Sequence, residues 1–519
     1  MRVAIAQLQP EVPNFWDILP LPRYGTPVVA TALRDAGFDV TCLIEGISRD
    51  LMKQIEEADV VGFTVLTAAA DRTYDLADRL RAKGKTVIFG GTHANYFLDD
   101  SLDHCDFVVL GDAEGPAIEL VGALSMGAPF GSIGGIAWRE EGRTRVNPIV
   151  PPQWRFDGVT DLELVKDYPA FLRRHPFAPV AFQATRGCPR RCRFCVTDKM
   201  FGEYHTRDVD TVVADLKDKL RYTRNIYFVD NNFAGNLAYT RRLLEAMLAA
   251  KVSMNAQVYV CQDFSRHTEL LRLMRQVGFT RILIGVESSR DEAMRRLGKQ
   301  QSFDRVREAV ATFKKHGFRV YASFIMGTPG ETAADAAAQL DVAERLGIDY
   351  AYFFLFSVYP EQCDDFAERD RVFLDDYRYA TGHFVMFLGD RVRPSVLQRI
   401  LVDTHLRFYS RRKMIRKVLT LAWRDAVEIS RHRYLFKRLA RTARAYASDL
   451  ERLERGLYAG DELQRSALAA APLKRLQSYD EAVHYRTRIP RPSAQRHARR
   501  AHPYSRQTRR CQGRQRQYL

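Results

Sequence analysis

The strongest constraint on the fold is a regular alternation of short apolar runs with helical stretches. In the first 140 residues, five apolar runs rich in β-branched residues are separated by stretches such as 26–36 and 69–82, whose apolar spacing is typical of helices. Nearly continuous apolar strands separated by helices predict a doubly wound parallel sheet, covered on both faces, over residues 1–140. The five predicted strands are 3–6, 40–44, 60–65, 86–89 and 107–110.

The same alternation resumes after a proline-containing stretch, residues 141–178, which we interpret as a linker. Six further pairs of strand and helix predict an open parallel (β/α)6 barrel over residues 179–385. The predicted barrel strands are 180–185, 225–229, 255–260, 281–285, 319–325 and 350–357, and the predicted helices include 209–222, 237–250, 270–277, 303–316 and 332–346.

The last part of the chain has a different composition. Residues 386–482 are predicted to form a mainly helical, basic segment, whose amphipathic pattern more often marks a packing face than a lipid surface. Residues 483–519 are predicted to be a disordered tail, because from Arg486 onward there are eleven arginines, no acidic residue and little apolar content. This tail carries eleven of the net +16 charges, so the overall charge does not indicate a nucleic-acid-binding protein.

The hydropathy of the chain gives no indication of a membrane span. The longest apolar runs, 60–70 and 350–360, have 11 residues each, whereas a membrane-spanning helix needs about 20. The first residues, 1–7, become polar too soon for a signal peptide and are predicted to be a strand. We therefore expect a cytoplasmic protein, for which peripheral membrane contact stays open.

Polar and glycine-rich loops follow three strands of the predicted N-terminal sheet. Gly90-Gly91-Thr92-His93 follows the fourth strand, Gly111-Asp112-Ala113-Glu114 follows the fifth, and Thr64 and Thr67 flank the end of the third. In a doubly wound sheet, ligands bind beyond the carboxyl ends of the strands, and glycines there let a bulky ligand approach the backbone. No Gly-x-Gly-x-x-Gly follows a strand, which disfavours a dinucleotide.

Three of the eight cysteines, Cys188, Cys192 and Cys195, fall within eight residues after the first barrel strand. Such clustering in a cytosolic protein indicates a metal site rather than disulfides. A structural zinc site needs four ligands, and the closest further candidate, His205, has no usual zinc spacing. Three thiolates suit a [4Fe–4S] cluster with one iron left open for substrate.

The segment Cys-x-x-x-Cys-x-Phe-Cys after the first strand of a β/α barrel resembles the signature of radical S-adenosylmethionine (SAM) enzymes. Three later segments, 227–233, 284–288 and 324–332, resemble the ends of the second, fourth and fifth strands of that family. The resemblance implies that the open iron binds SAM and that a 5′-deoxyadenosyl radical is formed in a barrel that excludes water. It implies SAM contacts for Phe194, Asp230, Asn231, Glu287, Ser288 and Gly327, with strand-end capping as the alternative for Asp230 and Glu287.

The doubly wound domain ahead of the barrel is similar to the flavodoxin-like cobalamin-binding domain of one radical SAM subclass. The chain lacks the Asp-x-His-x-x-Gly motif, so we do not expect cobalt ligation by a histidine of that motif. The loop at 111–114 also departs from the family's Gly-Glu-Gly-Glu. The resemblance implies cobalamin contacts for Thr64, Thr67, Gly90, Gly91, His93, Gly111 and Glu114.

The implied activity is methylation of an unactivated carbon in a small-molecule substrate, through a 5′-deoxyadenosyl radical and methylcobalamin. The implied partners are that substrate and an external electron donor of the flavodoxin or ferredoxin type, with no stable nucleic-acid complex. No residue of the sequence stands out as a catalytic acid or base.

Three alternatives remain open from the sequence. One is a cyclisation or rearrangement without net methyl transfer, as in the porphyrin-ring cyclases of the same subclass. The second is an RNA-modifying enzyme of the methylthiotransferase type, but such proteins carry a second three-cysteine cluster upstream, and only Cys42 and Cys105 precede residue 180 here. The third is a non-catalytic corrinoid carrier, which the intact cysteine triad disfavours.

Overall fold

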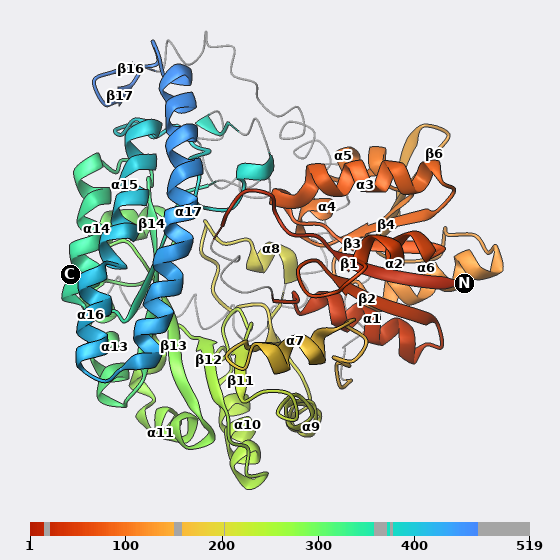
Figure 1. Cartoon of the computed structure of the whole chain (residues 1–519), viewed down its shortest axis with the longest axis horizontal. Helices are drawn as coiled ribbons and strands as arrows, with labels where there is room; N and C mark the ends of the chain where they lie inside the picture. The colour runs from red at the N-terminus through yellow and green to blue at the C-terminus, as the bar shows by residue number, and fades with distance from the viewer. Residues whose placement is uncertain (15–20, 150–157, 202, 358–370, 374–376, 465–519) are drawn as a thin grey trace, which may run out of the picture.

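The structure is a computed structural model of the 519-residue chain, shown in Figure 1. The described residues are 1–14, 21–149, 158–201, 203–357, 371–373 and 377–464. The predicted Arg-rich tail, 483–519, lies outside them. No helix among the described residues is both long and apolar enough to cross a membrane.

The N-terminal region is a seven-stranded sheet in the order β2-β1-β3-β4-β5-β6-β7. The first five strands pair in parallel, as predicted, and β6 and β7 extend the sheet with antiparallel pairing. The strands are β1 (Arg2–Gln7), β2 (Asp39–Ile44), β3 (Val60–Thr64), β4 (Thr86–Gly90), β5 (Phe107–Val109), β6 (Ile136–Glu140) and β7 (Arg143–Val146).

Helices cover both faces of this sheet, because its apolar strands must be shielded from water on each side. One face packs on α1 and α6 through Leu33 and Leu120, and the other on α3 and α5 through Leu76 and Leu102. The elements between the strands are α1 (Gly25–Asp35), α2 (Leu51–Glu57), η2 (Thr67–Ala69), α3 (Ala70–Ala82), α4 (Thr92–Tyr96), α5 (Leu98–His104) and α6 (Glu114–Met126).

The stretch 141–178, expected to be a linker, contains two regular elements. These are β7, which pairs with β6, and α7 (Tyr168–Arg174). Neither β6 nor β7 was predicted, because both strands are short and rich in polar residues, and their pairing depends on the free edge of β5.

The second sheet confirms the predicted open barrel. All six strands are parallel, in the order β15-β14-β13-β12-β11-β8, so β8 and β15 are the two edges of an incomplete barrel. The strands are β8 (Val180–Phe182), β11 (Asn225–Phe228), β12 (Asn255–Tyr259), β13 (Phe279–Glu287), β14 (Arg319–Met326) and β15 (Tyr350–Leu355). The segments between them include β9 (Thr185–Arg186), α8 (Thr197–Phe201), β10 (His205–Thr206), α9 (Val209–Lys219), α10 (Leu237–Ala249), η3 (Gln262–Arg266), α11 (Thr268–Val277), α12 (Asp291–Arg296), α13 (Phe303–Lys315) and α14 (Ala333–Arg345).

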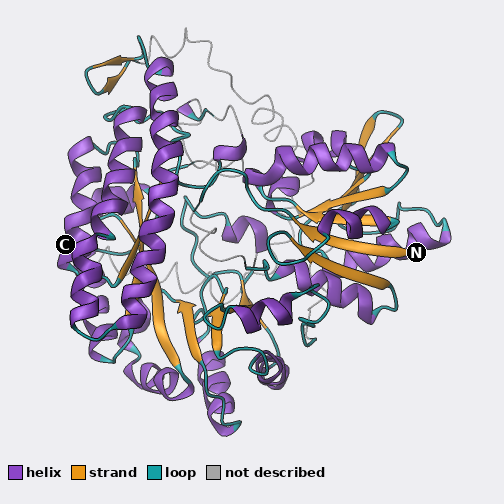
Figure 2. Ribbon diagram, viewed as in Figure 1, coloured by secondary structure: helices purple, strands orange, loops and turns teal. Residues whose placement is uncertain are grey.

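Helices also follow the barrel, as predicted, and they pack beside its last strand (Figure 2). In this group α15 (Pro394–Phe408) contacts both β15 and α14, and α17 (Trp423–Leu453) packs along α15. Between them, α16 (Arg411–Leu419) has no buried residue. A short hairpin, β16 (Tyr458–Ala459) and β17 (Glu462–Leu463), follows α17, and η6 (Tyr377–Tyr379) lies against the N-terminal domain.

Candidate cofactor sites

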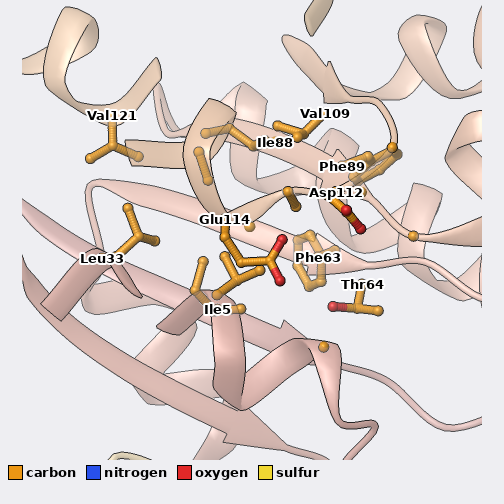
Figure 3. A pocket seen from close by; sticks show the side chains of 18 of the residues that line it. Ile5, Leu33, Phe63, Thr64, Ile88, Phe89, Val109, Asp112, Glu114 and Val121 are labelled. Atoms are coloured by element: carbon orange, nitrogen blue, oxygen red, sulfur yellow. The ribbon is translucent and has the colours of Figure 1, made fainter. Parts of the chain in front are cut away.

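A cavity of about 250 Å³ lies between the N-terminal sheet and helices α1 and α6 (Figure 3). Its walls are apolar, from residues such as Ile5, Leu33, Ile88 and Val121. It reaches the carboxyl ends of β3, β4 and β5, which is where ligands bind in doubly wound sheets. The predicted cobalamin-contacting residues that line it are Thr64, Gly90, Gly91, Gly111 and Glu114.

The structure does not bring the other two predicted residues, Thr67 and His93, to the lining of this cavity. Thr67 lies on η2. His93 is fully buried, its Nε2 lies 2.7 Å from the hydroxyl of Tyr74, and its ring stacks on Phe97. Burial lowers the pKa of His93 to about 3, so the ring is neutral at physiological pH. The expected corrin contact of His93 therefore has no support in this geometry, which instead makes the histidine part of the core.

Glycines at the edge of this cavity have backbones that other residues rarely adopt. Gly91 has a φ of 90° and Gly111 a φ of 70°. A Cβ added to Gly91 would lie 3.1 Å from the carbonyl oxygen of Val65. These glycines place no side chain at the edge of the apolar cavity. A corrinoid has a large ring and a tail that needs burial, so it fits a cavity of this kind.

The three clustered cysteines lie on one loop between β9 and α8, and none of their side chains is fully buried. The loop is held by backbone hydrogen bonds from Cys195 N to Cys192 O and from Arg193 N to Leu297 O. Cys195 Sγ also lies 3.2 Å from Thr197 Oγ1, at the start of α8. The thiols are therefore presented by a fixed loop beyond the carboxyl ends of the barrel strands.

A fourth thiol, that of Cys261, lies beside this loop and was not predicted. A hydrogen bond with Cys261 lowers the pKa of the Cys188 thiol and raises that of Cys261. Burial raises the pKa of Cys192 to about 11. Within the described part of the chain, no three His, Cys, Asp or Glu side chains converge closely enough to hold a single metal ion. A cubane cluster binds each of its thiolates at a different iron, so these thiolates need not converge on a single ion.

Asp230, at the end of β11, is fully buried and accepts four hydrogen bonds. Its donors are the backbone of Ala184 and the backbone and hydroxyl of Thr185, which enter the cysteine loop. Burial raises the pKa of Asp230 to about 6. This geometry favours strand-end capping over SAM contact. The next residue, Asn231, is exposed, and its side chain bonds Gly187 N and Thr197 Oγ1 on either side of the cysteines.

Glu287 ends β13 with a left-handed backbone, at a φ of 61°, next to a bulge in the sheet. Such strain in a non-glycine residue is concentrated at functional sites. Its carboxylate is paired with Lys299 Nζ at 2.7 Å, and Lys299 also acts electrostatically on Cys192. Gly285 leaves room for this pair, because a Cβ there would lie 2.0 Å from Glu287 Oε1. Lys299 was not predicted as a site residue, because nothing in its local sequence marks it as a partner of Glu287.

The other predicted SAM residues pack on protein. Ser288 is fully buried, and its hydroxyl accepts from Arg290 N at 3.2 Å. Gly327 has a φ of 80°, and a Cβ there would meet Leu397 of α15 at 2.4 Å, so this glycine makes room for a helix rather than for the expected nucleoside. Phe194 is half-buried and packs on an apolar cluster that includes Ile325.

An arginine that was not singled out as a site residue links the two regions. Arg186, at the end of β9, donates to Asp112 Oδ1 at 2.7 Å and to Glu114 Oε1 at 3.1 Å, and it lines the N-terminal cavity. Glu114 is only 5% exposed, so this ion pair is shielded from solvent. Arg186 directly precedes Gly187 and Cys188. It therefore fixes the cysteine loop to the loop at 111–114, which is predicted to contact cobalamin.

Comparisons with known proteins agree with this arrangement. Residues 182–342 match the radical SAM superfamily, and residues 19–121 match the B12 binding domain. An uncharacterized methyltransferase of Pyrococcus horikoshii is 29% identical over 76% of this chain and 89% of its own length. A bacteriochlorophyllide d C-12(1)-methyltransferase of Chlorobaculum tepidum is 26% identical over 69% of this chain and 76% of its own. An anaerobic magnesium-protoporphyrin IX monomethyl ester cyclase of Rubrivivax gelatinosus is 23% identical over 76% and 74%.

Two solved structures are similar in fold. The enzyme OxsB with aqua-cobalamin bound superposes with a TM-score of 0.62 and 14% identity over 93% of this chain and 84% of that one. The methyltransferase TsrM of Kitasatospora setae, with cobalamin and a [4Fe–4S] cluster bound, gives a TM-score of 0.60 and 19% identity over 69% and 73%. The chain therefore belongs to the radical SAM enzymes with a cobalamin-binding domain, whose cofactors are a [4Fe–4S] cluster, SAM and cobalamin.

Proposed function

We propose that this protein transfers a methyl group to an unactivated carbon of a small-molecule substrate. The observation that carries the proposal is the ion pair of Arg186 with Asp112 and Glu114, which holds the cysteine loop against the N-terminal cavity. When bound, the cluster with SAM supplies a radical that removes a hydrogen atom, and cobalamin supplies the methyl group. Two relatives named as methyltransferases support this reading.

In this proposal, each cofactor is held by a separate set of residues. The cluster is bound by Cys188, Cys192 and Cys195. Three predicted SAM residues lie in the cysteine loop or near it, namely Phe194, Asn231 and Glu287. Asp230, Ser288 and Gly327 support that site through their packing and hydrogen bonds. Cobalamin is held by Thr64, Gly90, Gly91, Gly111 and Glu114.

The electron for the cluster would come from an external protein of the flavodoxin or ferredoxin type. Arg191 and Arg193 are exposed beside the cysteines. Positive charge there favours encounter with an acidic electron carrier. The test is the salt dependence of the cluster reduction rate, which should fall as ionic strength rises.

The activity is tested with SAM whose methyl group carries deuterium. Anaerobically reconstituted protein is incubated with labelled SAM, a reductant and candidate substrates, and the products are analysed by mass spectrometry. We expect 5′-deoxyadenosine together with a product that contains the labelled methyl group. If the protein contains iron and cobalamin but forms no 5′-deoxyadenosine, the proposed function is wrong.

Cyclisation without methyl transfer is the second candidate, because a cyclase is among the relatives at similar coverage. The same experiment separates the two functions. A product that lacks the label and is cyclised or rearranged, formed together with 5′-deoxyadenosine, would favour the cyclase reading.

A further inference from the structure

A second and larger cavity, of about 1210 Å³, lies between the barrel and the N-terminal domain. Its walls come from strands β8, β11, β12, β13, β14 and β15, from the loop before α1 and from the start of α17. It exceeds the roughly 300–1,000 Å³ of ordinary small-molecule sites. None of the residues assigned above to the cofactors lines it except Asn231.

The cavity touches both cofactor regions. Tyr24, just before α1, lines this cavity and also the N-terminal one. Asn231, which also lines this cavity, accepts a hydrogen bond from the backbone of the cysteine loop at Gly187. A molecule bound here would therefore lie beside both the cobalamin site and the cysteine loop, where a substrate of the proposed reaction must lie.

The charge of the cavity wall is strongly one-sided. A single carboxylate, Glu428, lines it, and that group accepts a hydrogen bond from Tyr321 at 2.7 Å. No salt bridge between described residues involves any of the six arginines of the wall. These arginines are Arg23, Arg173, Arg224, Arg281, Arg424 and Arg431.

Two of these arginines have no carboxylate within salt-bridge distance among the described residues. Arg23 is exposed, lines the cavity and makes no side-chain hydrogen bond or ion pair with any described residue. Arg281 is half-buried, its Nε has no hydrogen-bond partner among the described residues, and its Nη1 lies 3.4 Å from Asn255 Oδ1. Against the effect of burial, Tyr321 and Glu428 nearby raise the pKa of Arg281, so the group stays charged. A guanidinium without a paired carboxylate can form a charge-assisted hydrogen bond to a bound anion.

The wall also carries several aromatic side chains. Tyr227, Tyr259, Tyr321 and Tyr352 line the cavity from β11, β12, β14 and β15, and Trp423 lines it from α17. Aromatic walls bind extended apolar bodies, and arginine forks bind carboxylate or phosphate.

We propose that this cavity is the substrate site, and that the substrate is an acidic molecule with a large apolar or aromatic body, its carboxylate or phosphate held by Arg23 and Arg281. This inference rests on the proposed function, because it names the substrate class of that reaction.

Two matched fluorescent probes test the inference without turnover. One is 8-anilino-1-naphthalenesulfonate, and the other is N-phenyl-1-naphthylamine, which has the same rings without the sulfonate. Both are titrated into the protein loaded with cluster and cobalamin, in the absence of SAM and reductant. We expect the sulfonate to bind about tenfold more tightly than the neutral probe, because it gains a charge-assisted hydrogen bond.

Substitution of single arginines tests which side chains bind the sulfonate group. Arg23→Gln and Arg281→Gln should each weaken sulfonate binding about tenfold and leave the neutral probe unchanged. Arg23→Lys, which keeps the charge, should recover most of the affinity. The control is Arg242→Gln, at an exposed arginine of α10 outside the cavity, which should change nothing.

Equal affinity of the two probes for the unaltered protein would overturn the inference, and so would unchanged sulfonate binding in both glutamine variants. The titration needs no SAM cleavage, so its failure is distinguishable from failure of the proposed function. If the protein binds the sulfonate selectively but transfers no methyl group, the inferred anion site stands and only the assignment as a methyltransferase is wrong.

Discussion

Residues near the cysteine loop have two kinds of role. Some face the cofactor region, and others hold the loop in place by hydrogen bonds to the strand that enters it. Glu287 combines a left-handed backbone with a buried ion pair to Lys299, and both features cost free energy that the surrounding sheet must supply. Asp230, by contrast, holds the strand that enters the loop through Thr185. Two acidic residues at the ends of β11 and β13 therefore have different roles.

The variant Cys192→Ala tests the cluster assignment. Removal of one of three thiolates should abolish iron retention and SAM cleavage, while cobalamin binding is retained because its site lies in the other domain. Iron content, 5′-deoxyadenosine and the cobalamin absorption spectrum measure the three effects. The matched control is Cys105→Ala, at a buried cysteine of the N-terminal core. Formation of 5′-deoxyadenosine by Cys192→Ala would contradict the assignment.

The buried carboxyl of Asp230 predicts a pH-dependent stability. Its pKa is raised from 3.8 to about 6 in the folded protein, so folding binds a proton between these values. The stabilisation is present below the unfolded pKa and is lost as the pH rises through about 6. Relative to Asp230→Asn, the unfolding free energy of the unaltered protein should fall by about 2–3 kcal/mol across this window. Denaturant titrations at a series of pH values measure the difference, and a flat difference would disprove the prediction.

At the scale of elements, the N-terminal cavity depends on how α6 packs on the sheet. Ala117 of α6 lines the cavity, whereas Ala123 of the same helix is equally buried but does not line it. Ala117→Phe should fill the slot and weaken cobalamin binding more than about tenfold, with cluster iron unchanged. Absorption titration with cobalamin gives the dissociation constant.

The variant Ala123→Phe is the matched control, because it should overpack the same helix at a comparable cost of about 1–3 kcal/mol without closing the cavity. His93→Asn should also leave the dissociation constant of cobalamin nearly unchanged, since His93 does not line the cavity. Equal loss of cobalamin in Ala117→Phe and Ala123→Phe would mean that the slot is not the binding site.

At the level of the whole molecule, Arg186 joins the barrel domain to the N-terminal domain. Arg186→Gln leaves Asp112 and the nearly buried Glu114 without their cation. We expect the free energy of unfolding to fall by about 2 kcal/mol, less than for a fully buried pair because the Arg186 side chain is 21% exposed. Denaturant unfolding of the cofactor-loaded protein measures this loss.

The control for this prediction is Arg145→Gln, which breaks an ion pair with Glu140 whose members are both 50% exposed. This change should cost less than about 0.5 kcal/mol. The double variant Arg186→Gln/Glu114→Gln should recover part of the lost stability, because it removes a buried charge without a partner. A loss in Arg186→Gln no larger than in the control would show that the link contributes little.

The amino-acid pattern was enough to predict most of the elements and their order. Strand and helix periods are local properties, so the parallel strands of both sheets were predicted within a few residues, while β6 and β7 were not, and the turn glycines at 91 and 111 followed from strand ends. The cysteine loop was equally visible, because its three thiols are adjacent in the chain. These features need no knowledge of distant residues.

Which of the marked residues face a cavity depended instead on how distant segments pack together. His93 is neutral and enclosed because Tyr74 and Phe97 surround it, Gly327 makes room for Leu397, and Glu287 is paired with Lys299. The arginines of the large cavity come from segments as distant as Arg23 and Arg431. Burial and charge at a site depend on the packing of many segments that are distant in the chain. No local pattern of the sequence predicts that packing.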